Sequence, residues 1–303
     1  MKKIFLTTTF IFLSILTFSC PICGCGGTNT YFGLFPNFRN GFMGVRYNYA
    51  HYHTRLFSDP AQFSINDYNT MELWGGANIG RRWQVMAFIP YYLNKQTDDD
   101  GTSTKNGIGD VTIIGQYKVF TKTSLSNNHA MVQQQLWLGG GVKLATGTFN
   151  PDVVNNNITV ADVNAQLGTG STDFILTSMY NIKINDFGFN ASANYKINAF
   201  NNEGYKFGNK FSSNLIAFYQ VNLNKKIIVP NAGIGYENVG KNSMQKTDVP
   251  FTKSSLTTAL AGVEISFPRL SIGLNAQMPL KQNFAEGQTK MSIKAMAHVT
   301  FTL

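Results

Sequence analysis

The chain has 303 residues and a formal net charge of +9, and it contains few charged residues (14%) beside many aromatic ones (13%). Its lysines and arginines are scattered singly, without a basic run or a patch interleaved with aromatic residues, which excludes a nucleic-acid partner. No apolar run after residue 19 approaches the roughly 20 residues of a membrane-spanning helix, which excludes a helical membrane protein.

The first predicted element is a cleaved signal peptide over residues 1–19, MKKIFLTTTFIFLSILTFS. Two lysines precede an apolar run of about 15 residues, which is too short to cross a bilayer as a mature helix. Thr17 and Ser19 are small residues at the two positions that a signal peptidase reads. We therefore expect cleavage after Ser19, with an N-terminal anchor helix as the alternative.

Residues 20–40, CPICGCGGTNTYFGLFPNFRN, form a cysteine-rich segment that holds every cysteine of the chain. Three thiols cannot all pair within one molecule. Cys20, Cys23 and Cys25 lie on a glycine-rich stretch, and soft thiolates of this kind suit Cu(I) or Zn. Three interpretations stay open: a Cu or Zn site, a lipidated Cys20, and a local disulfide with one spare thiol.

Residues 41–303 alternate between apolar and polar side chains, as transmembrane β-strands do. In DFGFNASANYKINA (186–199), phenylalanine, alanine, tyrosine and isoleucine share one face, while glycine, serine, asparagine and lysine share the other. The alternation recurs in DVTIIGQYKV (110–119), LSIGLNAQMPL (270–280) and SIKAMAHVTFTL (292–303). We expect one face of each strand to contact lipid and the other to face a lumen.

The connections between these strands are alternately long and short. The expected strands are 41–52, 67–79, 82–94, 107–121, 129–145, 170–183, 186–199, 207–223, 226–239, 253–267, 269–280 and 288–303. The long links are 53–66, 95–106, 146–169, 200–206, 240–252 and 281–287. Outer-membrane barrels have long extracellular loops, short periplasmic turns and an even number of strands, whereas a soluble sandwich has shorter strands and no such bias. The sequence therefore predicts an all-β fold: a single transmembrane antiparallel up-and-down β-barrel of about 12 strands over 41–303.

Three segments resemble, in order and spacing, a family of outer-membrane barrels named for the MetA pathway of phenol degradation. They are GIGDVTIIGQYKVF (107–120), KLATGTF (143–149) and LGTGSTDFILTSMY (167–180). Members of that family are described as transporters, and the resemblance implies passage of small, often apolar or aromatic compounds. The cysteine-rich N-terminus of the mature chain is similar to that of barrel proteins from Bacteroidetes-type bacteria.

The polar strand faces supply charged candidates for the lumen: Glu72, Asp110, Lys118, Lys143, Asp173, Lys196, Glu264 and Lys294. They either tune the passage of a solute or are paired groups that only hold the wall together. Residues 20–40 are long enough to fold into the lumen as a plug or to lie along the periplasmic rim.

The histidines give no catalytic site, and the one metal candidate among them is the pair His51 and His53. His51 and His53 share a strand face, but strand geometry places them some 25–35 Å from the cysteines, so one metal site cannot use both. We expect them as polar residues at the outer rim, and we expect His129 and His298 to be isolated. The sequence contains no Gly-x-Ser-x-Gly elbow and no His-Glu-x-x-His motif, which predicts that the chain is not an enzyme.

The sequence therefore predicts a channel or transporter of the bacterial outer membrane, with outer-membrane lipid and a small-molecule solute as its partners. The alternative is a non-transporting barrel whose Cys-x-x-Cys-x-Cys N-terminus binds a soft metal, Cu or Zn, or a periplasmic partner. Apart from this metal, no cofactor is expected. The sequence leaves the solute, the open or plugged state of the lumen and the oligomeric state undetermined.

Overall fold

The computed structural model describes residues 41–57, 62–99, 101–126, 130–151, 153–154, 157–158, 163 and 166–303. The predicted signal peptide, the cysteine-rich segment and His129 lie outside these residues. Strands account for most of the described chain. No described helix is long and apolar enough to cross a bilayer.

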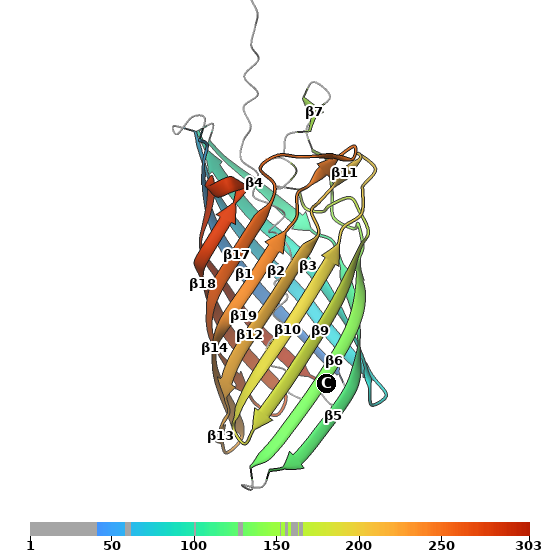
Figure 1. Cartoon of the computed structure of the whole chain (residues 1–303), viewed down its shortest axis with the longest axis vertical. Coiled ribbons are helices and arrows are strands. Elements are labelled where there is room, and N and C mark those ends of the chain that lie inside the picture. The colour runs from blue at the N-terminus through green and yellow to red at the C-terminus, as the bar shows by residue number, and fades with distance from the viewer. Residues whose placement is uncertain are drawn as a thin grey trace, which may run out of the picture.

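The strands close into a single antiparallel barrel of twelve, which confirms the predicted fold class (Figure 1). Each strand pairs with its neighbours in chain order, and the first pairs with the last. The barrel strands are β1 (Gly41–Arg55), β2 (Phe63–Ile79), β3 (Trp83–Asp98), β5 (Thr112–Leu125), β6 (Met131–Lys143), β9 (Asp173–Ile184), β10 (Phe187–Ile197), β12 (Lys210–Tyr219), β14 (Lys226–Val239), β17 (Ser254–Ser266), β18 (Leu270–Phe284) and β19 (Thr289–Thr302).

The two ends of the barrel differ. Strand β1 begins and β19 ends at the same end, where the backbone N–H of Leu303 donates to the carbonyl of Gly41 at 2.9 Å. The tight turns lie at this end, which we call the turn end. The opposite end, at the top of Figure 1, carries the long connections, and we call it the loop end. Its small strands are β7 (Val153–Val154), β8 (Asn157–Ile158), β11 (Tyr205–Lys206), β15 (Ser243–Met244) and β16 (Thr247–Asp248).

Two asparagines form tight turns at the turn end. Asn185 lies between β9 and β10, and Asn224 lies between the short strand β13 (Val221–Leu223) and β14. Their φ angles are 52° and 47°. Asparagine adopts this left-handed conformation at a low steric cost, and two-residue hairpin turns require it. The short links at these positions match the prediction.

The long connections contain more strand than the sequence analysis predicted. The prediction that residues 95–106 form a loop is wrong. Strand β3 continues to Asp98 and pairs with β4 (Gly101–Ile108) as a hairpin. The Asp-Gly sequence at 100–101, followed by threonines, is a hairpin signal that the prediction overlooked. The links 200–206 and 240–252 hold β11, β15 and β16, which form a small three-stranded sheet at the loop end.

The outer face of the barrel is an apolar belt. Leu176, Leu215, Ile234 and Leu274, from four different strands, are each about half exposed. A continuous exposed apolar surface is unfavourable in water, but it matches the lipid-facing band of a membrane barrel. Exposed aromatic residues lie nearer the strand ends, among them Trp83 at the turn end and Tyr195 at the loop end. Aromatic girdles of this kind mark the two membrane interfaces.

Candidate functional site

The candidate site is the interior of the barrel. Most of the predicted charges are less than one-tenth exposed on the inner face: Glu72, Asp110, Lys143, Asp173, Glu264 and Lys294. Lys118 and Lys196 are partly buried and share that face, because each lies two residues from a buried inward side chain, Gln116 and Asn194 respectively. The structure brings the six buried charges together with further residues in three separate groups.

The first group, the Lys143 cluster, lies toward the loop end where β5, β6 and β9 meet. The Lys143 Nζ is 2.5 Å from Asp110 Oδ2 and 3.0 Å from Asp173 Oδ2, so one ammonium pairs with two carboxylates. It also donates to the Thr169 hydroxyl and, at 3.1 Å, to the Ser171 carbonyl. The Ser171 hydroxyl donates in turn to Asp173 at 2.8 Å.

All three segments that carry the family resemblance meet in the Lys143 cluster. Asp110 comes from the first, Lys143 from the second and Asp173 from the third. The backbone N–H groups of Gly147 and Thr169 each donate to Asp110 at 2.9 Å. These bonds tie both ends of the long connection 144–172 to the barrel wall. In this structure, the residues of the motifs therefore build a buried anchor in which each charged side chain has a partner of opposite charge.

The second group contains Arg46 and Glu72, which pair across β1 and β2. The Arg46 Nε donates to Glu72 Oε1 at 2.9 Å. The guanidinium also lies 5.3 Å from the centroid of the Trp74 ring and 5.5 Å from that of Phe88. Both rings belong to a buried inner-face group, which we call the aromatic cluster: Phe42, Trp74, Met86, Phe88 and Ile114. This cluster covers the wall formed by β1, β2, β3 and β5.

His298 belongs to the same region, so the prediction that it is isolated is wrong. Its Nε2 lies 2.9 Å from Glu264 Oε1, although β19 and β17 are separated by β18. The intervening residue is Gly273, and a Cβ there would collide with both partners. The His298 ring also contacts the edge of Trp74, with centroids 6.0 Å apart. Sequence spacing alone does not reveal a pair that reaches across a third strand.

The third group is centred on Glu237, which the sequence analysis did not select. Its carboxylate lies 2.9 Å from the Lys210 Nζ and 3.1 Å from the Lys294 Nζ. Lys294 reaches it from β19, three strands around the ring from β14. Glu237 and Arg46 both follow the alternation of their strands, so the apolar–polar pattern contained the signal for both of them.

The two remaining predicted charges form no part of these ion pairs. The Lys118 Nζ lies over the Trp137 ring, 4.7 Å from its centroid, toward the turn end. Lys196 lies directly opposite Lys210 in the register of β10 and β12.

His51 and His53 lie on the outer face near the loop end, since they alternate with the buried Tyr52 and Thr54. The His51 Nδ1 is 2.7 Å from Asp67 Oδ1 on β2. Within the described residues, no three histidine, cysteine or carboxylate side chains are grouped so as to hold a metal ion. Cys20, Cys23 and Cys25 are outside those residues, so their predicted Cu or Zn site stays a prediction.

Three buried asparagines lie on the inner face of strands that do not carry the aromatic cluster, and we call them the amide wall: Asn194 on β10, Asn231 on β14 and Asn275 on β18. In the strand register, Asn194 is level with Ser212 and Glu237 and so lies nearer the loop end than Asn231. Neither side-chain polar atom of Asn194 or Asn275 has a hydrogen-bond partner among the described residues, nor does the Asn231 carbonyl oxygen. Gly262 separates Asn231 from Asn275, and a Cβ at this glycine would lie 3.2 Å from the Asn231 Oδ1 and 2.8 Å from the Asn275 Nδ2. Unpaired amides in an interior are costly unless something hydrogen-bonds to them.

Of three comparisons with known proteins, the one with solved structures found similar folds. No family model matches the sequence. No curated protein matches it either. Among solved structures, the chain is similar to an outer membrane channel from Pseudomonas putida F1, with a TM-score of 0.59 and 14% identity over 91% of this chain and 99% of that one. It is also similar to the β domain of the Bordetella autotransporter BrkA, with a TM-score of 0.49 and 11% identity over 87% of this chain and 100% of that one. At such identities the likeness concerns the fold.

Proposed function

We propose that the chain is a channel of the bacterial outer membrane that passes small molecules through the barrel interior. The apolar belt and its two aromatic girdles support the membrane placement, because this outer surface suits hydrocarbon rather than water. The likeness of the fold to the Pseudomonas putida outer membrane channel supports the same placement.

The observation that carries the proposal is that the charges of the interior are paired, while neutral amides there keep atoms without a partner. Each inner-face carboxylate described above is paired with a lysine, an arginine or a histidine. Among the buried side chains with a polar atom that has no hydrogen-bond partner in the described residues are Asn194, Asn231 and Asn275 and, beside the aromatic cluster, Trp74 and Gln116. The aromatic cluster lies on β1, β2, β3 and β5. A solute that has both a ring or hydrocarbon part and a hydroxyl or carbonyl group can contact both kinds of surface.

We assign the solute to small uncharged molecules of that mixed character. The resemblance of the sequence to barrels named for phenol degradation supports this class, since it implies passage of small apolar or aromatic compounds. A ring packs favourably on Trp74 and Phe88, because aromatic pairs attract beyond the area that they bury. An amide can both donate and accept, so the amide wall suits a hydroxyl group on the solute.

Liposome swelling tests the proposal. The purified mature chain is reconstituted into liposomes, and influx is compared for a phenyl glycoside, the matching methyl glycoside and a sugar acid. We expect influx of all the neutral solutes above that of empty liposomes, with the phenyl glycoside entering faster than its size alone predicts. Influx equal to that of empty liposomes for every solute contradicts a channel and favours a sealed, non-transporting barrel.

A further inference from the structure

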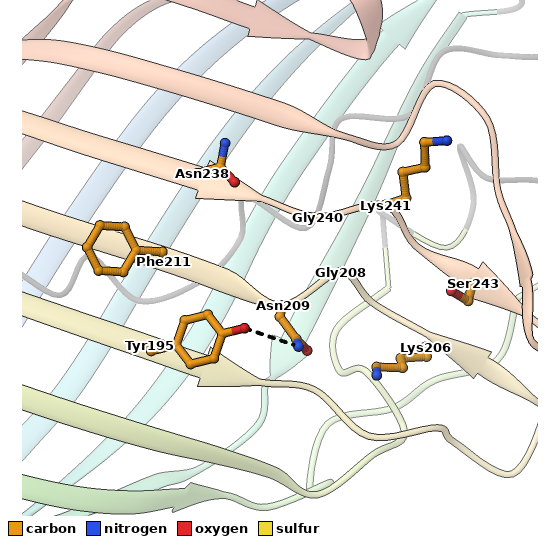
Figure 2. A pocket seen from close by; sticks show the side chains of 9 residues that line it. All are labelled: Tyr195, Lys206, Gly208, Asn209, Phe211, Asn238, Gly240, Lys241 and Ser243. Carbon is orange, nitrogen blue, oxygen red and sulfur yellow. Dashed lines mark hydrogen bonds between the residues drawn. The ribbon is translucent and has the colours of Figure 1, made fainter.

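A pocket of about 350 Å³ opens on the outer surface at the loop end of β10, β12 and β14 (Figure 2). It does not communicate with the amide wall, since its strand residues point outward. The described residues that line it are Tyr195, Lys206, Gly208, Asn209, Phe211, Asn238, Gly240, Lys241 and Ser243. They include two lysines and no carboxylate.

The floor of the pocket is part of the aromatic girdle. Tyr195, Phe211 and Asn238 are direct neighbours in the register of the three strands. Tyr195 and Phe211 are 40% and 37% exposed. The Asn209 side-chain amide donates to the Tyr195 hydroxyl at 3.4 Å, as the dashed line in Figure 2 shows. In a membrane barrel, this is the level at which lipid headgroups meet the acyl chains.

The two lysines come from the connections above this floor. Lys206 lies on β11, where it pairs with Ser243 of β15. Lys241 begins the connection that follows β14, and its Nζ lies 3.5 Å from Asp248. Both members of that ion pair are more than half exposed, and an exposed pair contributes little. A phosphate group can therefore replace the carboxylate of Asp248 at Lys241.

The backbone around the pocket is held in place by buried contacts. Gly208 packs so closely against the Gly240 carbonyl that a Cβ would not fit there. The Gly208 N–H donates at 2.8 Å to the side chain of Asn242, which donates in turn at 2.7 Å to the Tyr205 hydroxyl. Asn242 and Tyr205 are each 1% exposed. A pocket that is preorganised in this way loses less entropy when a ligand binds.

The surface below the floor is apolar. Small outward residues are adjacent across the strands, Ala193 beside Ser213 and Ala217 beside Ala232. The exposed Leu215 lies between these two levels. Such a surface accommodates acyl chains that descend from a headgroup. A free anion has no apolar part and would not contact it.

We propose that this pocket binds the phosphate headgroup of a phosphorylated glycolipid in the outer leaflet of the membrane. Lys206 and Lys241 contact the phosphate, Asn209, Asn238 and Ser243 face the sugar hydroxyls, and the girdle below supports the acyl chains. The inference rests on the membrane placement proposed above but not on transport, so a barrel that passes no solute still binds the lipid.

Native mass spectrometry of the full mature chain in detergent tests this proposal, with bisphosphorylated lipid A as the probe. Each basic residue near a charged lipid surface contributes about 1 kcal/mol, so the variant K206A/K241A should bind at least about tenfold more weakly. The matched control K225A/K226A removes two exposed lysines at the turn end and should bind like the unaltered chain. The variant K206R/K241R should retain binding, which shows that the pocket is intact.

Several outcomes overturn the proposal. One is equal binding by the unaltered chain and K206A/K241A, and another is an equal loss in the control. Displacement of the lipid by an equal concentration of inorganic phosphate would instead indicate a site for a free anion. Liposome swelling separates this inference from the proposed function, because K206A/K241A should leave solute influx unchanged.

Discussion

The Lys143 cluster and the amide wall are two polar regions of one barrel interior, and they use their side chains in opposite ways. In the cluster, Lys143 contacts Asp110 and Asp173. The Thr169 N–H donates to the same Asp110 oxygen that Lys143 contacts, and the Gly147 N–H donates to the other. On the amide wall, Asn194 and Asn275 have no side-chain partner among the described residues. Each charged side chain of the cluster has a partner of opposite charge without a ligand, whereas these amides have no partner.

This difference separates structure from function inside the barrel. Charged residues on the inner face of a barrel are natural candidates for a functional site. A buried charge, however, is stable only when it is paired with an opposite charge. Once paired, it holds strands and connections together. A neutral amide is tolerated without a fixed partner, because water or a solute can hydrogen-bond to it. We therefore expect substitutions in the two regions to affect different properties.

The largest effect on stability is expected for Lys143→Met. This change leaves Asp110 and Asp173 next to each other without a cation, and breaking a buried pair in this way costs about 3–5 kcal/mol. Denaturant unfolding of the reconstituted chain, followed by the electrophoretic shift of folded barrels, measures the loss. Lys122→Met removes an exposed lysine from β5 and should change stability by less than about 0.5 kcal/mol. Equal losses in the two variants would contradict the role of the cluster as an anchor.

A smaller effect on stability, with a change in ion selectivity, is expected for Glu237→Gln. Lys210 and Lys294 then lose the carboxylate that pairs with both of them. The interior therefore becomes more positive by one charge. The reversal potential of reconstituted channels in a salt gradient should shift toward the equilibrium potential of the anion. Glu286→Gln makes the same charge change at an exposed position of the loop end and serves as the control. An equal shift in both variants would remove Glu237 from the permeation route.

The sequence could predict the barrel because each strand repeats the same local alternation. Residues such as Phe187 and Phe189 point outward and Asn190 and Asn194 inward, as the pattern indicates. It could also select charged inner-face residues. It could not predict their partners, because the pair of His298 and Glu264 spans a third strand, and Lys294 reaches Glu237 across two intervening strands. Such contacts depend on barrel register, which local sequence does not encode.

The cysteine segment shows the same limit on local reasoning. A Cys-x-x-Cys-x-Cys spacing suits a soft metal wherever it occurs, but its meaning depends on what the rest of the fold places beside it. Titration of the reduced mature chain with Cu(I), compared with a Cys23→Ser/Cys25→Ser variant, decides that prediction. An unchanged stoichiometry in the variant rules the metal site out.

The most direct test of the account is solute influx through a barrel with an altered amide wall. Replacing Asn231 and Asn275 together by valine removes three unpaired polar atoms and one long hydrogen bond, from Asn231 to the Val229 carbonyl at 3.4 Å, so stability should change by less than about 1 kcal/mol. Influx of a phenyl glycoside into liposomes should fall about fivefold, which corresponds to one lost hydrogen bond. Asn238→Val, on the outer face of the same strand, should leave influx unchanged. Undiminished influx through the double variant would contradict the claim that solutes pass along the amide wall.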